Sequence, residues 1–93
     1  MKDLESLRNR IDAIDDSIIE LFLERMEVAK GVANFKKDRD MKIFDEKREA
    51  EVIKKNLNKI KDSEFKSYAE QFLHALMNIS KELQKDCIEG KMK

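Results

Sequence analysis

Residues 4–35 carry the strongest structural signal in the chain and read LESLRNRIDAIDDSIIELFLERMEVAKGVANF. Apolar side chains recur there at alternating steps of three and four residues, at Leu4, Leu7, Ile11, Ile14, Ile18, Leu21, Val28, Val32 and Phe35. This spacing is typical of the a and d positions of a heptad repeat. It predicts one continuous helix from about residue 4 to residue 36 with an apolar seam, and Asp3 is the expected N-cap.

The predicted helix is too long for a compact chain of this size. At 1.5 Å per residue it would measure about 50 Å. A compact globule of 93 residues has a diameter of only about 30 Å. The helix therefore cannot bury its whole seam inside its own chain, and we expect a second subunit to cover it.

Composition limits the fold class and the kinds of partner. The chain has 20 Lys and Arg, 20 Asp and Glu, two Gly and no Pro. Few turn-forming residues argue against a strand-rich sandwich or barrel and favour an all-α fold. Zero net charge removes the usual electrostatic case for nucleic acid or an anionic membrane surface as a partner. The lone Cys87 and the lack of a signal-peptide core favour a soluble, cytoplasmic protein.

Two further helices are expected after a polar loop at residues 37–42. Asp45 is the expected N-cap of a helix from Glu46 to about Ile60. The inward-facing residues of that helix are predicted to be Val52, Ile53, Leu57 and Ile60. After a short break, the third helix has an expected apolar stripe of Phe65, Tyr68, Phe72, Leu76, Ile79, Leu83 and Cys87. We predict one helical domain at residues 1–87 and a polar C-terminal tail at residues 88–93.

Arg25 occupies an a position of the seam, between Leu21 and Val28. A buried guanidinium needs an anion beside it. That anion is either a carboxylate of the protein, which would make Arg25 a salt-bridged or register-setting residue, or the carboxylate or phosphate of a ligand. Lys36 follows about three turns later on the same face, roughly 16 Å along the axis. Two long side chains at this distance leave room for a small dianion.

Other polar residues suit either a surface or a binding site. Arg8 lies about 25 Å from Arg25 along the helix, so it is either a solvated charge or a residue that acts across a dimer interface. The acids of Asp45-Glu46-Lys47-Arg48-Glu49 also suit the first turn of a helix. Ser80 and Gln84 share one face of the third helix, as ordinary surface residues or as donors in a pocket. We expect no cofactor and no metal, because no Cys/His cluster, phosphate-binding glycine loop or nucleophile–base pair is present in the sequence.

These polar residues occur in the order Arg8, Arg25, Lys36, Asp45-x-x-Arg48-Glu49 and Ser80-x-x-x-Gln84. They are embedded in the phrases Leu7-Arg8-x-x-Ile11-Asp12-x-Ile14-Asp15, Leu23-Glu24-Arg25 and Ile43-Phe44-Asp45-x-x-Arg48-Glu49. Over roughly residues 4–87 the chain resembles the all-helical, type II class of chorismate mutases. Lys42 departs from the pattern, since many members carry proline there, but the change removes no ligand-binding group.

The resemblance implies three helices per chain in an intertwined homodimeric bundle. It also implies the pericyclic rearrangement of chorismate to prephenate, a step towards phenylalanine and tyrosine. By position, Arg25 and Ser80 would hold the ring carboxylate, and Arg8 of the partner subunit with Lys36 would hold the enolpyruvyl carboxylate. Lys36 and Gln84 would donate to the ether oxygen. Glu49 would accept from the ring hydroxyl near the Asp45 backbone, and Arg48 would complete the cationic wall.

Two alternatives stay open at this point. An isochorismate pyruvate-lyase uses a similar cationic pocket on the same fold, and pyruvate release would distinguish it. A non-catalytic helical dimerisation or regulatory module would need only a salt-bridged Arg25. Such a module would not require Lys36, Arg48, Glu49, Ser80 and Gln84 to converge on one cavity.

Overall fold

A computed structural model of the chain describes residues 3–91. Helix α1 spans Leu4–Asp38, α2 spans Glu46–Leu57 and α3 spans Lys66–Ile88, with a short 3₁₀ helix, η1, at Ser63–Phe65. No strand occurs within the described residues. The prediction of an all-α fold with three helices, the first very long, is confirmed.

Side-chain caps explain where α1 and α2 begin. Asp3 Oδ1 accepts a hydrogen bond from the Ser6 amide at 2.8 Å, and Asp45 Oδ1 accepts one from the Arg48 amide at 3.0 Å. Both predicted N-caps are therefore confirmed. α1 runs two residues past its predicted end and stops before Asp40, whose φ of 55° lies in the left-handed region and cannot continue a right-handed helix.

The later helix boundaries differ slightly from the predictions. α2 ends at Leu57 rather than at Ile60, because the Ile60 amide bonds to the Leu57 carbonyl at 3.1 Å in the tighter pattern of a turn. α3 begins at Lys66, directly after η1, and includes Ile88, which we predicted to belong to the C-terminal tail. Residues 92–93 of that predicted tail lie outside the described residues.

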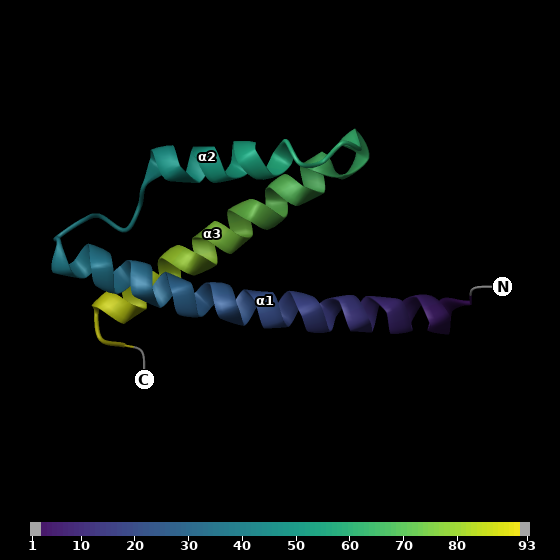
Figure 1. Cartoon of the computed structure of the whole chain (residues 1–93), viewed down its shortest axis with the longest axis horizontal. Helices are drawn as coiled ribbons and strands as arrows, with labels where there is room; N and C mark the ends of the chain where they lie inside the picture. The colour runs from purple at the N-terminus through teal and green to yellow at the C-terminus, as the bar shows by residue number, and fades with distance from the viewer. Residues whose placement is uncertain (1–2, 92–93) are drawn as a thin grey trace.

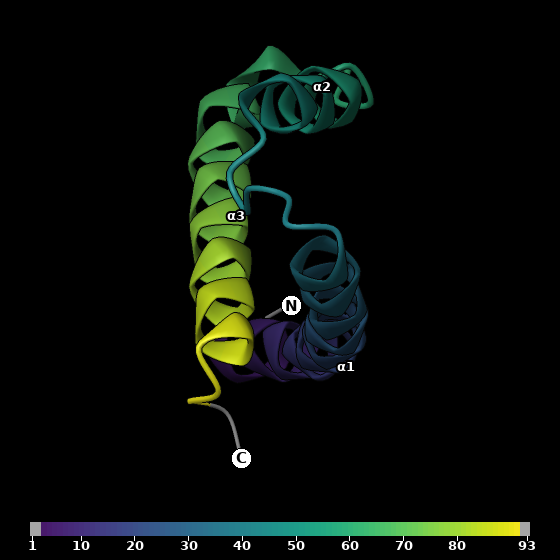
Figure 2. The same ribbon diagram turned by 90° about the vertical axis from the view of Figure 1, so that its left-hand side faces the viewer.

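The three helices form two thin layers. α1 and α2 lie apart in one layer, and α3 packs against both of them from the other layer (Figures 1 and 2). The chain extends 57 × 31 × 14 Å and has a radius of gyration of 16.6 Å, against about 12 Å for a compact chain of this length. The shortest dimension accommodates two packed helices and nothing more, so their outer faces are uncovered. No described helix is long and apolar enough to cross a membrane.

The face of α3 that is buried within the chain differs from its apolar stripe. Four members of the predicted stripe are exposed, namely Phe65, Tyr68, Phe72 and Ile79. The buried residues of α3 are Leu73, Met77, Ser80 and Gln84. This face lies one residue further round the helix, which corresponds to about 100°. The predicted stripe is therefore the apolar face that the chain's own helices leave uncovered, and a periodic pattern alone does not show which face those helices cover.

The two halves of α1 have different surroundings. Every residue from 7 to 21 is exposed, whereas Met26, Ala29 and Ala33 are buried in the half that α3 crosses (Figure 1). Seam residues such as Ile11 and Ile14 are 55% and 56% exposed. The chain does leave its seam uncovered, as its length predicts, and a second subunit over this seam stays a prediction.

Candidate active site

A cavity of about 280 Å³ lies between α1 and α2 and is closed on one side by α3. It is lined by all of the predicted site residues except Arg8, namely Arg25, Lys36, Asp45, Arg48, Glu49, Ser80 and Gln84. Arg8 is exposed in the N-terminal half of α1, outside this cavity. The fold therefore gathers residues that are distributed over some sixty positions of the sequence and leaves one predicted member apart.

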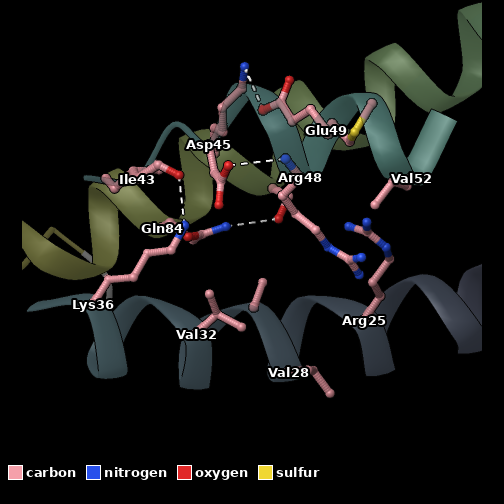
Figure 3. Close-up of a pocket in the computed structure, with 14 residues that line it drawn as sticks. Arg25, Val28, Val32, Lys36, Ile43, Asp45, Arg48, Glu49, Val52 and Gln84 are labelled. Carbon is pink, nitrogen blue, oxygen red and sulfur yellow. Dashed lines mark hydrogen bonds and ion pairs between the residues drawn. The ribbon is translucent and has the colours of Figure 1, made fainter. Parts of the chain in front are cut away.

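α1 forms one wall of the cavity (Figure 3). Arg25 and Lys36 both line this wall, as their helical spacing predicts. The apolar surface between them comes from Val28, Ala29 and Val32. The Lys36 ammonium donates to the Ile43 carbonyl at 2.8 Å, and it has further N–H groups with which to bind a ligand. This hydrogen bond holds the charge at one end of the cavity.

Arg25 and Arg48 extend from α1 and α2 toward the same part of the cavity (Figure 3). Neither guanidinium forms an ion pair with a carboxylate of residues 3–91. Two neighbouring cations repel one another, and an anion supplied from elsewhere would bind both. The interpretation of Arg25 as a residue salt-bridged within its own chain therefore has no support in the described residues.

The first turn of α2 brings two carboxylates to the cavity. Asp45 caps the helix through one oxygen. Glu49 forms an ion pair with Lys81, with 3.0 Å between Oε2 and Nζ. Lys81 lines the cavity from α3 and is a residue that our sequence predictions missed. It lies four residues after Met77 and three before Gln84, so helical spacing could have placed it on this face, but its ion pair is a tertiary contact that spacing does not reveal.

Ser80 and Gln84 form a buried polar pair on α3. They are 9% and 7% exposed, so the interpretation of the two as ordinary surface residues is wrong. Gln84 Nε2 donates to Ser80 Oγ at 3.2 Å (Figure 3), which leaves the Ser80 hydroxyl hydrogen for another acceptor. Gln84 Oε1 is buried without a hydrogen-bond partner among the described residues. The groups of the pair that can bind an acceptor in the cavity are the Ser80 hydroxyl and the second Nε2 hydrogen of Gln84.

The charges of the cavity do not balance. The cationic side chains that line it are Arg25, Lys36, Arg48 and Lys81, and the anionic ones are Asp45 and Glu49. Two positive charges are therefore in excess. An excess of this size, next to apolar wall residues, suits a small organic dianion.

A known protein family matches most of this chain. The family described as chorismate mutase type II matches residues 7–85. The chain belongs to the type II chorismate mutase family. The match reaches from the first turns of α1 to the last turns of α3, so every polar residue of the cavity lies inside this chorismate mutase domain.

Two curated relatives cover different parts of the chain. A bifunctional chorismate mutase/prephenate dehydratase of Aquifex aeolicus (strain VF5) is 31% identical over 88 residues, which are 95% of this chain and 24% of that protein. A 3-dehydroquinate dehydratase of Pyrobaculum aerophilum is 35% identical over 52 residues, which are 56% of this chain and 17% of that protein. This chain thus spans only a minor part of either relative. No solved structure matches the chain significantly.

Proposed function

We propose that this chorismate mutase domain is an isomerase that rearranges chorismate to prephenate. The observation that carries the proposal is the cavity, where three cations of the family pattern, Arg25, Lys36 and Arg48, meet the buried Ser80–Gln84 pair. Chorismate carries two carboxylates, and the cavity has two positive charges in excess. A cytoplasmic location stays a prediction from the sequence.

The proposed reaction needs positioning and electrostatic stabilisation only. One ether C–O bond breaks and one C–C bond forms within the same molecule, so no nucleophile or proton shuttle is required. Holding the substrate in its folded, reactive conformer supplies the orientation term. Negative charge grows on the ether oxygen as the C–O bond breaks, and fixed donors stabilise it there. Lys36 on α1 and Gln84 on α3 are the proposed donors, and their positions on two walls of one cavity support this role.

The two carboxylates of the substrate need separate cationic partners. We assign the ring carboxylate to Arg25 and to the Ser80 hydroxyl, whose hydrogen is not used by Gln84. The enolpyruvyl carboxylate is assigned to Lys36 and to Arg8 of the partner subunit. Arg48 completes the cationic wall, and Glu49 accepts a hydrogen bond from the ring hydroxyl near the Asp45 backbone.

An intertwined homodimer is part of the proposal. Arg8 of the same chain lies outside the cavity, about 25 Å along α1 from Arg25. The half of α1 that carries Arg8 is exposed from residue 7 to residue 21. A second copy that covers this seam would bring its own Arg8 to the cavity of the first copy.

The direct test is an assay of the purified chain with chorismate. We expect chorismate absorbance to fall and prephenate to form at a rate proportional to enzyme concentration. Isochorismate is assayed in parallel for pyruvate release, which would identify the chain as a lyase instead. Stable chorismate in the presence of folded, dimeric protein would contradict the proposal and favour the non-catalytic module.

Lys36 and its neighbour Lys37 provide a matched pair of variants. Lys36→Ala should lower kcat by about 10²–10³, because it removes a charged donor from the ether oxygen. Lys37 is exposed and lies outside the cavity, so Lys37→Ala should retain the wild-type rate. Steady-state kinetics on both variants checks the assignment, and a near-normal kcat for Lys36→Ala would show that Lys36 has another role.

A further inference from the structure

The Glu49–Lys81 ion pair is the best protected of the ion pairs that involve residues 3–91. The two side chains are 22% and 30% exposed, whereas each of the other three pairs has a side chain that is 54% exposed or more. Exposed pairs are screened by water and salt and contribute little. A pair that is largely shielded from solvent, at the edge of a cavity, constrains its members more strongly.

A second contact restricts Lys81 further. Its Nζ lies 4.6 Å from the centroid of the Phe44 ring, within the range of a cation–π interaction. The three groups come from three parts of the chain, since Phe44 precedes α2, Glu49 lies in its first turn and Lys81 is on α3. The ammonium is thus held between an aromatic ring and a carboxylate, at a position that lines the cavity.

We infer that Lys81 is a positioning residue that orients the Glu49 carboxylate toward the substrate, an inference that rests on the proposed function. Lys81 binds Oε2 of Glu49, which leaves Oε1 to accept from the ring hydroxyl. Lys81 also compensates the charge of Glu49. Without it, a bare carboxylate would face a dianionic substrate and repel it.

The test is a double-mutant cycle on kcat/KM. Lys81→Met keeps the apolar stem and removes the charge, and it should lower kcat/KM about tenfold, as expected when a directly contacting pair is broken. In a Glu49→Gln background the same substitution should cost less than about twofold, because residues that act through one another are not additive. Lys81→Arg preserves both the ion pair and the cation–π contact and should restore most of the activity.

Lys85 provides the matched control. It lies on the same helix, is exposed and does not line the cavity, so Lys85→Met makes the same change of charge and should leave kcat/KM near the wild-type value. A thermal melt of each variant shows whether it is folded and how far its stability changes.

Three outcomes would overturn the inference. Losses that multiply in the Lys81→Met/Glu49→Gln double variant would mean that Lys81 acts independently of Glu49, for example as a structural link between α2 and α3. If Lys81→Met and Lys85→Met have the same kcat/KM, the Lys81 side chain does not affect the reaction. Both results leave the proposed function intact if wild type converts chorismate, whereas an inactive wild type overturns the inference and the proposed function together.

Discussion

The two halves of α1 share one heptad pattern but have different neighbours. Residues 7–21 are exposed throughout, although they carry a large part of the apolar seam. The following half contains the buried Met26, Ala29 and Ala33 and the cavity-lining Arg25 and Lys36. Within the chain, α1 packs through Met26, Ala29 and Ala33 on a face beside the seam, so the seam of the N-terminal half stays available for another surface.

This difference shows what a heptad repeat does and does not reveal. The repeat locates the apolar side of a helix, but it does not identify the surface that covers it. Burying one Leu or Ile side chain stabilises a structure by about 1.5–3 kcal/mol. The exposed seam residues of the N-terminal half are Leu4, Leu7, Ile11, Ile14, Ile18 and Leu21. A continuous exposed row of this kind marks an interaction surface.

The largest effect is expected from a charge in the exposed half. Ile14→Asp places a carboxylate in the middle of the seam and should abolish the proposed dimer, because a buried, unpaired charge costs several kcal/mol. Activity should fall to background with it, since no partner Arg8 would reach the cavity. Sedimentation velocity and the chorismate assay, run on the same sample, measure both effects.

Ala13→Asp is the control for that variant, since Ala13 is exposed and lies about 100° round the helix from Ile14, away from the a and d positions. It should remain dimeric and active. A folded, monomeric Ile14→Asp variant with wild-type activity would contradict both the shared cavity and the role of Arg8.

A mixture of two inactive chains tests whether both halves of α1 serve one site. Arg8→Ala and Arg25→Ala should each be nearly inactive alone. In a two-fold symmetric dimer, a mixed pair of these chains has about one intact site of its two. About half of the dimers in an equimolar, re-equilibrated mixture are mixed, so about a quarter of the wild-type sites should be recovered. No recovery, with mixed dimers demonstrated by mass spectrometry, would mean that the two arginines serve the same chain.

A smaller effect is expected from one substitution made in both halves. Ala33 is 0% exposed, so Ala33→Leu overpacks the contact region of α1 and should lower the free energy of unfolding by about 1–3 kcal/mol. Ala13→Leu, in the exposed half, should change it by less than about 0.5 kcal/mol. Urea unfolding measures both values, and equal losses would show that the two halves are packed alike.

Local features of this chain were predictable from the sequence. The caps Asp3 and Asp45 act through backbone amides three residues away, and the long α1 follows from an uninterrupted periodic pattern. The convergence of Arg25 with Lys36 is likewise a consequence of helix geometry. These predictions succeed because each depends on residues within one helix or one turn.

The predictions that failed concern faces and long-range contacts. Ser80 and Gln84 suited an exposed helix surface but are buried, while Phe72 and Ile79 of the apolar stripe are exposed within the chain. Lys81 was missed because its role depends on its contacts with Glu49 and Phe44, which come from other parts of the chain.

The order and spacing of residues were enough to specify three helices, their caps and the polar groups able to bind a dianion, since hydrogen bonding and side-chain periodicity act over a few residues. Packing of α3 against both α1 and α2 determined which of those groups share a cavity, why Ser80 and Gln84 are buried, and why Lys81 faces Glu49. Such contacts depend on the relative placement of whole helices, which results from the sum of many weak interactions distributed over the entire chain.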